Sequence, residues 1–163
     1  MFPADIEALA RRVIEAAAGQ GLTLATAESC TGGLVAGALT AIPGSSAVVE
    51  RGFVTYSNAA KSDLLGVSSE LVDTYGAVSE PVARAMAEGA LGRSQAMISV
   101  SVTGIAGPGG GSADKPVGLV HFGAAGPSGA VHVKHLFGDL GRDGVRLASV
   151  RVALELLLDR IGS

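Results

Sequence analysis

Short runs rich in β-branched residues alternate with segments of helical periodicity, and this alternation limits the fold more than any other feature of the chain. The strand-like runs are "LTLATAES", "AVVERGFVTY", "AMISVSVT", "VGLVHFGAA" and "AVHVKHLF". Strands that alternate with helices predict a sheet with helices on both faces, and "GPSG" between the last two runs predicts a hairpin turn. We therefore expect an α/β fold: a three-layer α/β/α sandwich with a mostly parallel sheet and one late antiparallel hairpin.

Helices are expected where apolar residues recur at spacings of three and four. The predicted helices cover residues 4–18, 31–42, 58–66, 79–91 and 142–161. Ser79, Glu80 and Pro81 form a typical helix start, with a cap, an early acid and a proline that the first turn tolerates. The chain has 163 residues, no linker-like composition and no long repeat. We expect a single domain over residues 1–163.

Composition excludes several classes of protein. An apolar fraction of 48% against 17% charged residues indicates a compact globule. The net charge of −3 argues against nucleic acid as a partner. A single cysteine fits a reducing compartment. No apolar run approaches the roughly 20 residues of a membrane helix, and the start lacks the pattern of a signal peptide. These features predict a cytoplasmic chain that binds neither membrane nor nucleic acid.

Three loops are candidates for a site, because each follows a predicted strand with polar or glycine-rich sequence. They are residues 28–33, 56–61 and 103–115. In open α/β sheets, ligands bind beyond the carboxyl ends of the strands. If the strands are mostly parallel, we expect these loops to meet at one edge of the sheet.

The first loop, "TAESCTGG", has two interpretations. Its helix-start amides could cradle an oxyanion beside a nucleophile, or Ser29 or Thr31 could simply cap the helix. The G-x-S-x-G signature of α/β-hydrolases is absent. Cys30 is more typical of a small buried residue than of a nucleophile. The residues alone leave capping and catalysis open.

The other two loops are also ambiguous when taken alone. Lys61 could serve as a base for a serine nucleophile if it is desolvated, although a lysine at this place in a short helix is usually exposed. The glycine-dense stretch "GIAGPGGGSADKP" matches neither of the named phosphate-binding motifs and predicts a lid, a pocket wall or a plain surface loop. The three histidines lack the companions of a metal site, so we expect no metal.

Taken together, the motifs resemble a known family. They are "TAESCTGG", "GSSAVVERGFVTYSNAAKSDLLGV", "GAVSEPVA", "SVTGIAGPGGGSADKPVG" and "RDGVR". The chain resembles the CinA C-terminal-domain family of nicotinamide mononucleotide amidohydrolases, over about residues 5–160. The larger CinA proteins carry an extra N-terminal domain, so the resemblance implies the stand-alone deamidase form.

The resemblance implies hydrolysis of the carboxamide of nicotinamide mononucleotide to nicotinate mononucleotide and ammonia, in pyridine nucleotide salvage, without metal or cofactor. It implies that Ser29 is the nucleophile and Lys61 its base, with Tyr56 placing the pyridine ring or the lysine. The residues implied in substrate binding are Thr31, Gly32, Gly33, Thr103, Gly104 and Arg142. Arg146, four residues after Arg142 in "RDGVR", is the alternative partner for the phosphate. A homodimer or a higher homo-oligomer is also implied.

A second hypothesis belongs to another class of function. The chain could be a non-catalytic nucleotide-binding regulatory module of the competence- and damage-inducible CinA type. The presence of both Ser29 and Lys61 favours the enzyme, because a pure binder has no use for that pair. Ammonia release from nicotinamide mononucleotide distinguishes the two.

Overall fold

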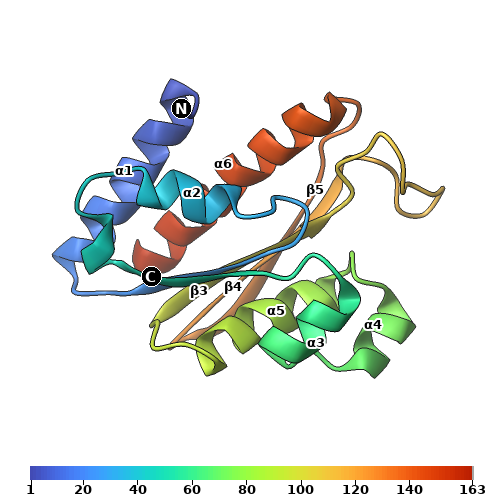
Figure 1. The fold of residues 1–163 in the computed structure, drawn as a ribbon, viewed down its shortest axis with the longest axis horizontal. Helices are drawn as coiled ribbons and strands as arrows, with labels where there is room; N and C mark the ends of the chain where they lie inside the picture. The colour runs from blue at the N-terminus through green and yellow to red at the C-terminus, as the bar shows by residue number, and fades with distance from the viewer. Residues whose placement is uncertain (163) are drawn as a thin grey trace.

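The computed structural model describes residues 1–162 and contains a five-stranded mixed sheet between two layers of helices (Figure 1). Ser163, the last residue of the predicted domain, lies outside the described residues. The strands are β1 (Leu24–Glu28), β2 (Val49–Val54), β3 (Ile98–Gly104), β4 (Leu119–Gly126) and β5 (Gly129–Leu136). Their order is β2-β1-β3-β4-β5; β1 pairs in parallel with β2 and β3, whereas β4 runs antiparallel to β3 and β5. Only β4 opposes the other four strands, which confirms the mostly parallel sheet with a late hairpin.

The helices form the outer layers of the sandwich. One face of the sheet carries α1 (Ala4–Gly19), α2 (Leu34–Thr40) and α6 (Gly141–Gly162), and the other carries α3 (Asn58–Leu65), α4 (Ser69–Tyr75) and α5 (Glu80–Gly92) (Figure 1). A short 3-10 helix, η1 (Ser45–Ala47), precedes β2. The predicted three layers are therefore confirmed. No helix within residues 1–162 is long and apolar enough to cross a membrane.

Two apolar cores fill the space between the layers. The larger lies under α1, α2 and α6 and includes the fully buried Phe122 and Leu154. The smaller lies under α3, α4 and α5 and joins Leu65 and Met86 to Ala27 of β1. Because successive strand residues face opposite sides, β1 contributes to both cores, and all five of its residues are buried.

Gly89 in α5 allows α3 to approach closely. A Cβ atom at this position would lie 2.0 Å from the carbonyl oxygen of Leu65. That distance is too short for any side chain, so only glycine permits this contact. The close packing matters for function, since α3 also carries Lys61.

The structure departs from the sequence-based expectation in two helices. Helix α2 begins at Leu34 rather than Thr31, because Gly32 and Gly33 adopt φ values of 57° and 105°, in the left-handed region that an α-helix excludes. Helix α4 was not predicted, although Ser68 caps it by accepting a hydrogen bond from the backbone N–H of Leu71. The turn predicted between β4 and β5 is confirmed by the pairing of Gly126 with Gly129.

Candidate active site

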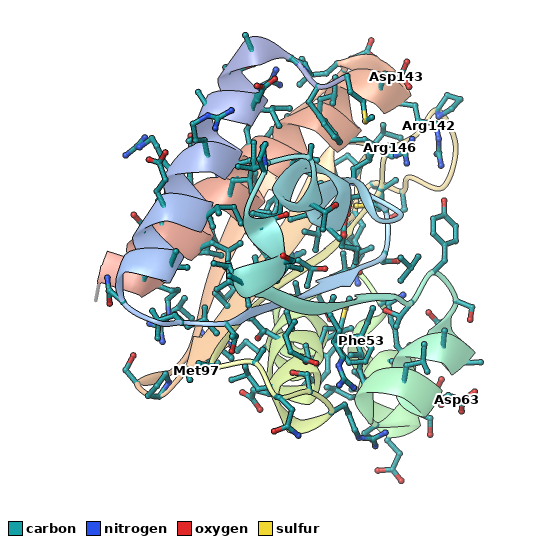
Figure 2. All side chains as sticks on the ribbon, turned by 60° about the vertical axis from the view of Figure 1, so that its left-hand side comes forward. Phe53, Asp63, Met97, Arg142, Asp143 and Arg146 are labelled. Atoms are coloured by element: carbon teal, nitrogen blue, oxygen red, sulfur yellow. The ribbon has the colours of Figure 1, made fainter. Side chains whose placement is uncertain are left out.

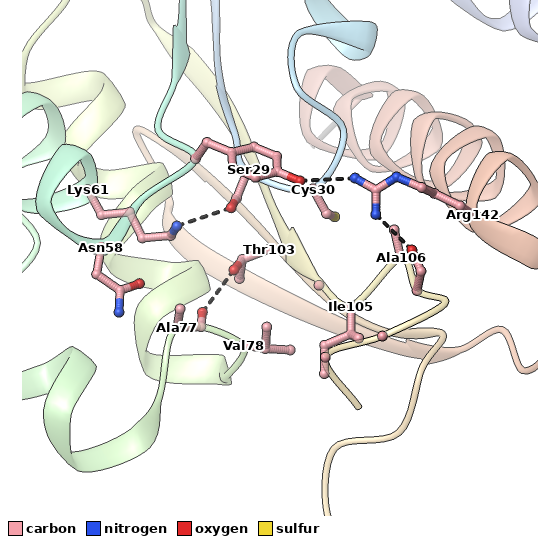
Figure 3. A pocket seen from close by; sticks show the side chains of 15 residues that line it. Ser29, Cys30, Asn58, Lys61, Ala77, Val78, Thr103, Ile105, Ala106 and Arg142 are labelled. Carbon is pink, nitrogen blue, oxygen red and sulfur yellow. Dashed lines mark hydrogen bonds between the residues drawn. The ribbon is translucent and has the colours of Figure 1, made fainter. Parts of the chain in front are cut away.

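A cavity of about 280 Å³ opens where the three predicted loops meet (Figure 3). Its wall includes Ser29 and Cys30 after β1, three residues around the start of α3, and residues 103–107, 109 and 110 at and beyond the end of β3. The three residues near α3 are Tyr56, Asn58 and Lys61. Parallel pairing of β1 with β2 and β3 brings these strand ends to one edge of the sheet. The expected convergence of the loops is confirmed.

Ser29 and Lys61 face each other in this cavity. Lys61 Nζ lies 3.1 Å from Ser29 Oγ (Figure 3). It also donates a 2.9 Å hydrogen bond to the carbonyl oxygen of Thr55. The backbone N–H of Ser29 donates to the carbonyl oxygen of Val102, which extends the β1–β3 ladder by one residue. The serine is therefore held by the sheet, and the lysine by the chain that leaves β2.

Lys61 is buried, with only 1% of its surface exposed. Burial lowers the pKa of its amine below the ordinary value of 10.5, because desolvation disfavours the charged form. Within residues 1–162 no carboxylate forms an ion pair with it that would restore the charge. A lysine at such a helix position is usually exposed, but Lys61 is buried. An uncharged amine beside a serine hydroxyl can accept the hydroxyl proton.

Cys30 also borders the cavity but is unsuited to attack. Burial is the main cause that raises the pKa of its thiol to about 11. The thiolate is the nucleophilic form of cysteine, so Cys30 stays protonated and unreactive near neutral pH. The structure agrees with the interpretation of Cys30 as a small buried residue.

Tyr56 and Arg142 lie at the mouth of the cavity and contact each other. The guanidinium of Arg142 donates a 3.0 Å hydrogen bond to the hydroxyl oxygen of Tyr56 and a 2.7 Å hydrogen bond to the carbonyl oxygen of Gly107. Arg142 belongs to the first turn of α6, and Tyr56 follows β2. The pair therefore connects the start of α6 to the loop between β2 and α3 across the cavity.

Thr103 and Gly104 line the cavity floor at the end of β3. The Thr103 hydroxyl donates a 2.9 Å hydrogen bond to the carbonyl oxygen of Ala77, in the segment between α4 and α5 (Figure 3). Gly104 is required sterically, because a Cβ atom there would lie 2.6 Å from the Val120 side chain. Both predicted residues are thus at the site.

Three predicted substrate-binding residues, Thr31, Gly32 and Gly33, are not among the residues that line the cavity. Thr31 is fully buried, and its hydroxyl donates a 2.6 Å hydrogen bond to the Glu28 carboxylate. The same carboxylate accepts from the first backbone N–H groups of α2, so these cannot hold a substrate anion. The structure therefore does not bring these three residues to the cavity wall, because the Glu28 side chain already occupies the helix start.

Arg142 and Arg146 are now distinguished by geometry. Both project from the beginning of α6 (Figure 2). Arg142 lines the cavity, whereas Arg146 turns to the backbone and donates to the carbonyl oxygens of Cys30 and Thr31 at 3.1 and 3.3 Å. The structure therefore favours Arg142 as the cation that faces a ligand.

The histidines lie outside this cavity. His121 Nδ1 and His132 Nε2 are 2.8 Å apart, and burial is the main cause that lowers the pKa of His121 to about 4. Within residues 1–162 no group of three or more His, Cys, Asp or Glu side chains is placed to hold a metal ion.

The family model of the CinA C-terminal domain matches residues 6–161. The chain belongs to the CinA C-terminal-domain family. A "CinA-like protein" from Synechococcus sp. (strain RCC307) is 54% identical over 96% of this chain and 38% of its own length. A "putative competence-damage inducible protein" from Symbiobacterium thermophilum is 52% identical over 96% of this chain and 39% of its own length. The chain thus spans about two fifths of these curated CinA relatives.

Solved structures show the same fold. A competence/damage inducible protein from Agrobacterium tumefaciens superposes with a TM-score of 0.97 at 58% identity, over 100% of this chain and 99% of that one. A CinA superfamily protein from Escherichia coli gives a TM-score of 0.92 at 37% identity, over 98% of this chain and 93% of that one. These names place the chain among CinA proteins of the competence/damage-inducible type.

Sequence reasoning missed two features of this CinA-family site, the support of the turn after β1 and one wall of the cavity. Glu28 and Arg146 fasten the turn after β1, and Ala77 and Val78 form one wall of the cavity. The wall was missed together with α4, whose signals were a capping serine at 68 and a glycine at 76. The sequence contained a weaker indication of the role of Glu28, which is an acid at the end of an otherwise uncharged strand.

Proposed function

We propose that the chain hydrolyses the carboxamide of nicotinamide mononucleotide to nicotinate mononucleotide and ammonia through a Ser29 acyl-enzyme. The main support is the 3.1 Å separation of Lys61 Nζ from Ser29 Oγ, with the lysine 1% exposed. A buried lysine with no carboxylate partner costs stability, which a plain binding module has no reason to retain. The family resemblance of the motifs supports the choice of substrate.

Each step of the proposed reaction uses groups in the cavity. Ser29 Oγ attacks the carboxamide carbon while its proton passes to Lys61 Nζ. The C–N bond then breaks, and Lys61 returns that proton to the departing ammonia. Water attacks the resulting ester with Lys61 again as base, which releases the carboxylate and regenerates Ser29. The backbone N–H of Cys30, a residue that lines the cavity, donates to no oxygen atom within residues 1–162, so it is available to stabilise the oxyanion.

Recognition of the phosphate is assigned to Arg142 in this proposal. The whole chain carries a net charge of −3, so an anionic substrate needs a local cation. Arg142 is the arginine that lines the cavity, and guanidinium groups bind phosphate with strong, directional hydrogen bonds. We further propose that the enzyme acts in cytoplasmic pyridine nucleotide salvage as a homodimer or higher homo-oligomer.

The test is release of ammonia from nicotinamide mononucleotide, measured for the purified chain and matched variants. Wild type should release ammonia, and Ser29→Ala should lower kcat by about 10⁴-fold or more. Cys30→Ala changes the adjacent residue and should keep most of the activity, since the thiol stays protonated. Nicotinate mononucleotide should be identified as the second product.

Two results would contradict the proposal. A folded wild type that binds the mononucleotide without releasing ammonia would favour the non-catalytic regulatory module. An active Ser29→Ala together with an inactive Cys30→Ala would move the nucleophile to the cysteine.

A further inference from the structure

Glu28 is a buried acid for which residues 1–162 supply no cationic partner. It ends β1, directly before Ser29, and only 1% of its surface is exposed. A carboxyl group removed from water is costly unless hydrogen bonds replace its hydration. The contacts of Glu28 therefore show what it does in the fold.

Three donors satisfy the Glu28 carboxylate. One oxygen accepts from the Thr31 hydroxyl at 2.6 Å and from the backbone N–H of Val35 at 2.9 Å, and the other accepts from the backbone N–H of Ala36 at 3.0 Å. These donors lie within the turn after Ser29 and in the first turn of α2. One side chain thus ties together the end of β1, the turn and the helix.

Arg146 holds the same turn by donating hydrogen bonds to carbonyl oxygens of the turn. Its Nε donates to the carbonyl oxygen of Cys30 at 3.1 Å and its Nη2 to that of Thr31 at 3.3 Å. Gly32 and Gly33, both with positive φ, follow immediately. Glycines leave a turn with wide conformational freedom, so the orientation of Ser29 depends on these outside contacts.

We propose that Glu28 is a positioning residue for the Ser29 nucleophile: together with Arg146 it fixes the turn of residues 29–33 and so keeps Ser29 Oγ within reach of Lys61. The inference rests on the proposed function for its catalytic meaning. Misplacement of a reacting atom by about 1 Å can reduce a rate by about 10²-fold. The effect of losing Glu28 therefore falls on the chemical step, whereas substrate contacts stay in place.

The first variant is Glu28→Gln, which keeps the shape but presents an NH₂ group to donors. We expect kcat to fall by about 10²-fold with little change in KM. Glu70→Gln is the matched control, because Glu70 is exposed in the first turn of α4. It should behave as wild type in activity and in thermal unfolding.

A second pair of variants covers the case in which Glu28→Gln does not fold. Thr31→Val removes the hydroxyl donor at nearly constant volume, and Thr31→Ser keeps it. We expect Thr31→Val to lose about 10-fold or more in kcat, as one strong hydrogen bond is worth, and Thr31→Ser to recover most of that loss. Equal impairment of the two would show that packing, rather than the bond to Glu28, matters at this position.

Labelling of Ser29 by a fluorophosphonate separates this inference from the proposed function, because the probe reports on the serine without an amide substrate. Slower labelling of Glu28→Gln and Thr31→Val than of wild type supports the inference even if nicotinamide mononucleotide is not hydrolysed. Wild-type labelling rates in these folded variants overturn it. A wild-type Ser29 that resists the probe overturns both the inference and the serine mechanism.

Discussion

At the scale of single residues, Lys61 shows how the fold changes the chemistry of a side chain. An ordinary lysine is a solvated cation. Here α3 brings the amine to the end of β1, where Ser29 and the Thr55 carbonyl replace water. Desolvation lowers the pKa of the amine, so the group that costs folding energy is also the group that can act as a base.

The free-energy cost of burying the Lys61 amine should appear in the pH dependence of stability. The pKa of Lys61 is lowered in the folded state and returns to about 10.5 on unfolding. Between those two values the unfolded chain binds more protons, so the free energy of unfolding should rise with pH across that window. Lys61→Met should remove this rise and be more stable than wild type below the window. Urea unfolding at a series of pH values measures it, with Lys134→Met as the control at an exposed lysine.

The same residue governs the pH dependence of activity. Turnover should rise as pH passes through the lowered pKa of Lys61, because only the neutral amine accepts the serine proton. Lys61→Arg keeps a cation that does not deprotonate and should lose about 10²–10⁴-fold in kcat. Steady-state pH profiles of the two proteins test this. Near-normal turnover by Lys61→Arg would show that the lysine serves as a charge and not as a base.

At the scale of elements, α6 carries two arginines that make different contacts. Arg142 and Arg146 are four residues apart and lie on one face of the helix. The first reaches the cavity mouth and the second reaches the turn after β1. One helix therefore connects the proposed phosphate contact to the support of the nucleophile.

This division of roles predicts different substrate profiles for the two arginine variants. Arg142→Ala should lower kcat/KM for nicotinamide mononucleotide by about 10- to 100-fold, the worth of a hydrogen bond to a charged group, and affect nicotinamide riboside far less. Arg146→Ala should impair both compounds by a similar factor, since it contacts the turn. Equal losses on both compounds for Arg142→Ala would assign it a structural role.

Most helices, strands and loops could be predicted from the sequence, for reasons that can be stated. Strands β1 and β3 are short apolar runs with clear ends, and the glycines and polar residues after them mark loops. The sequence did not indicate that the partner of the α2 amides is a side chain, Glu28, or that Thr31, Gly32 and Gly33 would lie off the cavity wall. Local pattern shows that the N–H groups of a helix start need acceptors, but not which acceptor the fold supplies.

At the scale of the whole molecule, the reversal of chain direction at β4 shapes the site. Parallel strands β2, β1 and β3 deliver the serine, the lysine and the floor of the cavity to one edge. The chain must then return to begin β4 beside β3, and residues 105–118 make that return as a long loop (Figure 1). The first part of this loop, up to Gly110, lines the cavity. A fully parallel sheet would have sent the chain away through a crossover helix.

The base of this returning loop is closed by backbone hydrogen bonds. The N–H of Ile105 donates to the carbonyl oxygen of Leu119 at 2.9 Å, and the N–H of Gly118 donates to that of Ile105 at 2.8 Å. Loop-closure entropy grows slowly, by about 0.6 kcal/mol for each doubling of length. An insertion of three Gly/Ser residues after Gly110 should therefore leave thermal unfolding nearly unchanged while it raises KM for the mononucleotide. A large loss of stability would show that the loop is part of the core.

In this arrangement, the length of the loop between β3 and β4 can change which substrate the cavity accepts. The backbone of Ser29 is hydrogen-bonded to Val102, and the turn after Ser29 is hydrogen-bonded to Glu28 and Arg146. Lys61 is hydrogen-bonded to Thr55. None of these contacts comes from residues 106–117. Mutations and insertions can accumulate in that stretch without disturbing the proposed nucleophile or its proposed base. For the proposed amide hydrolysis, a change confined to this loop therefore alters which amide is accepted while the Ser29–Lys61 pair stays in place.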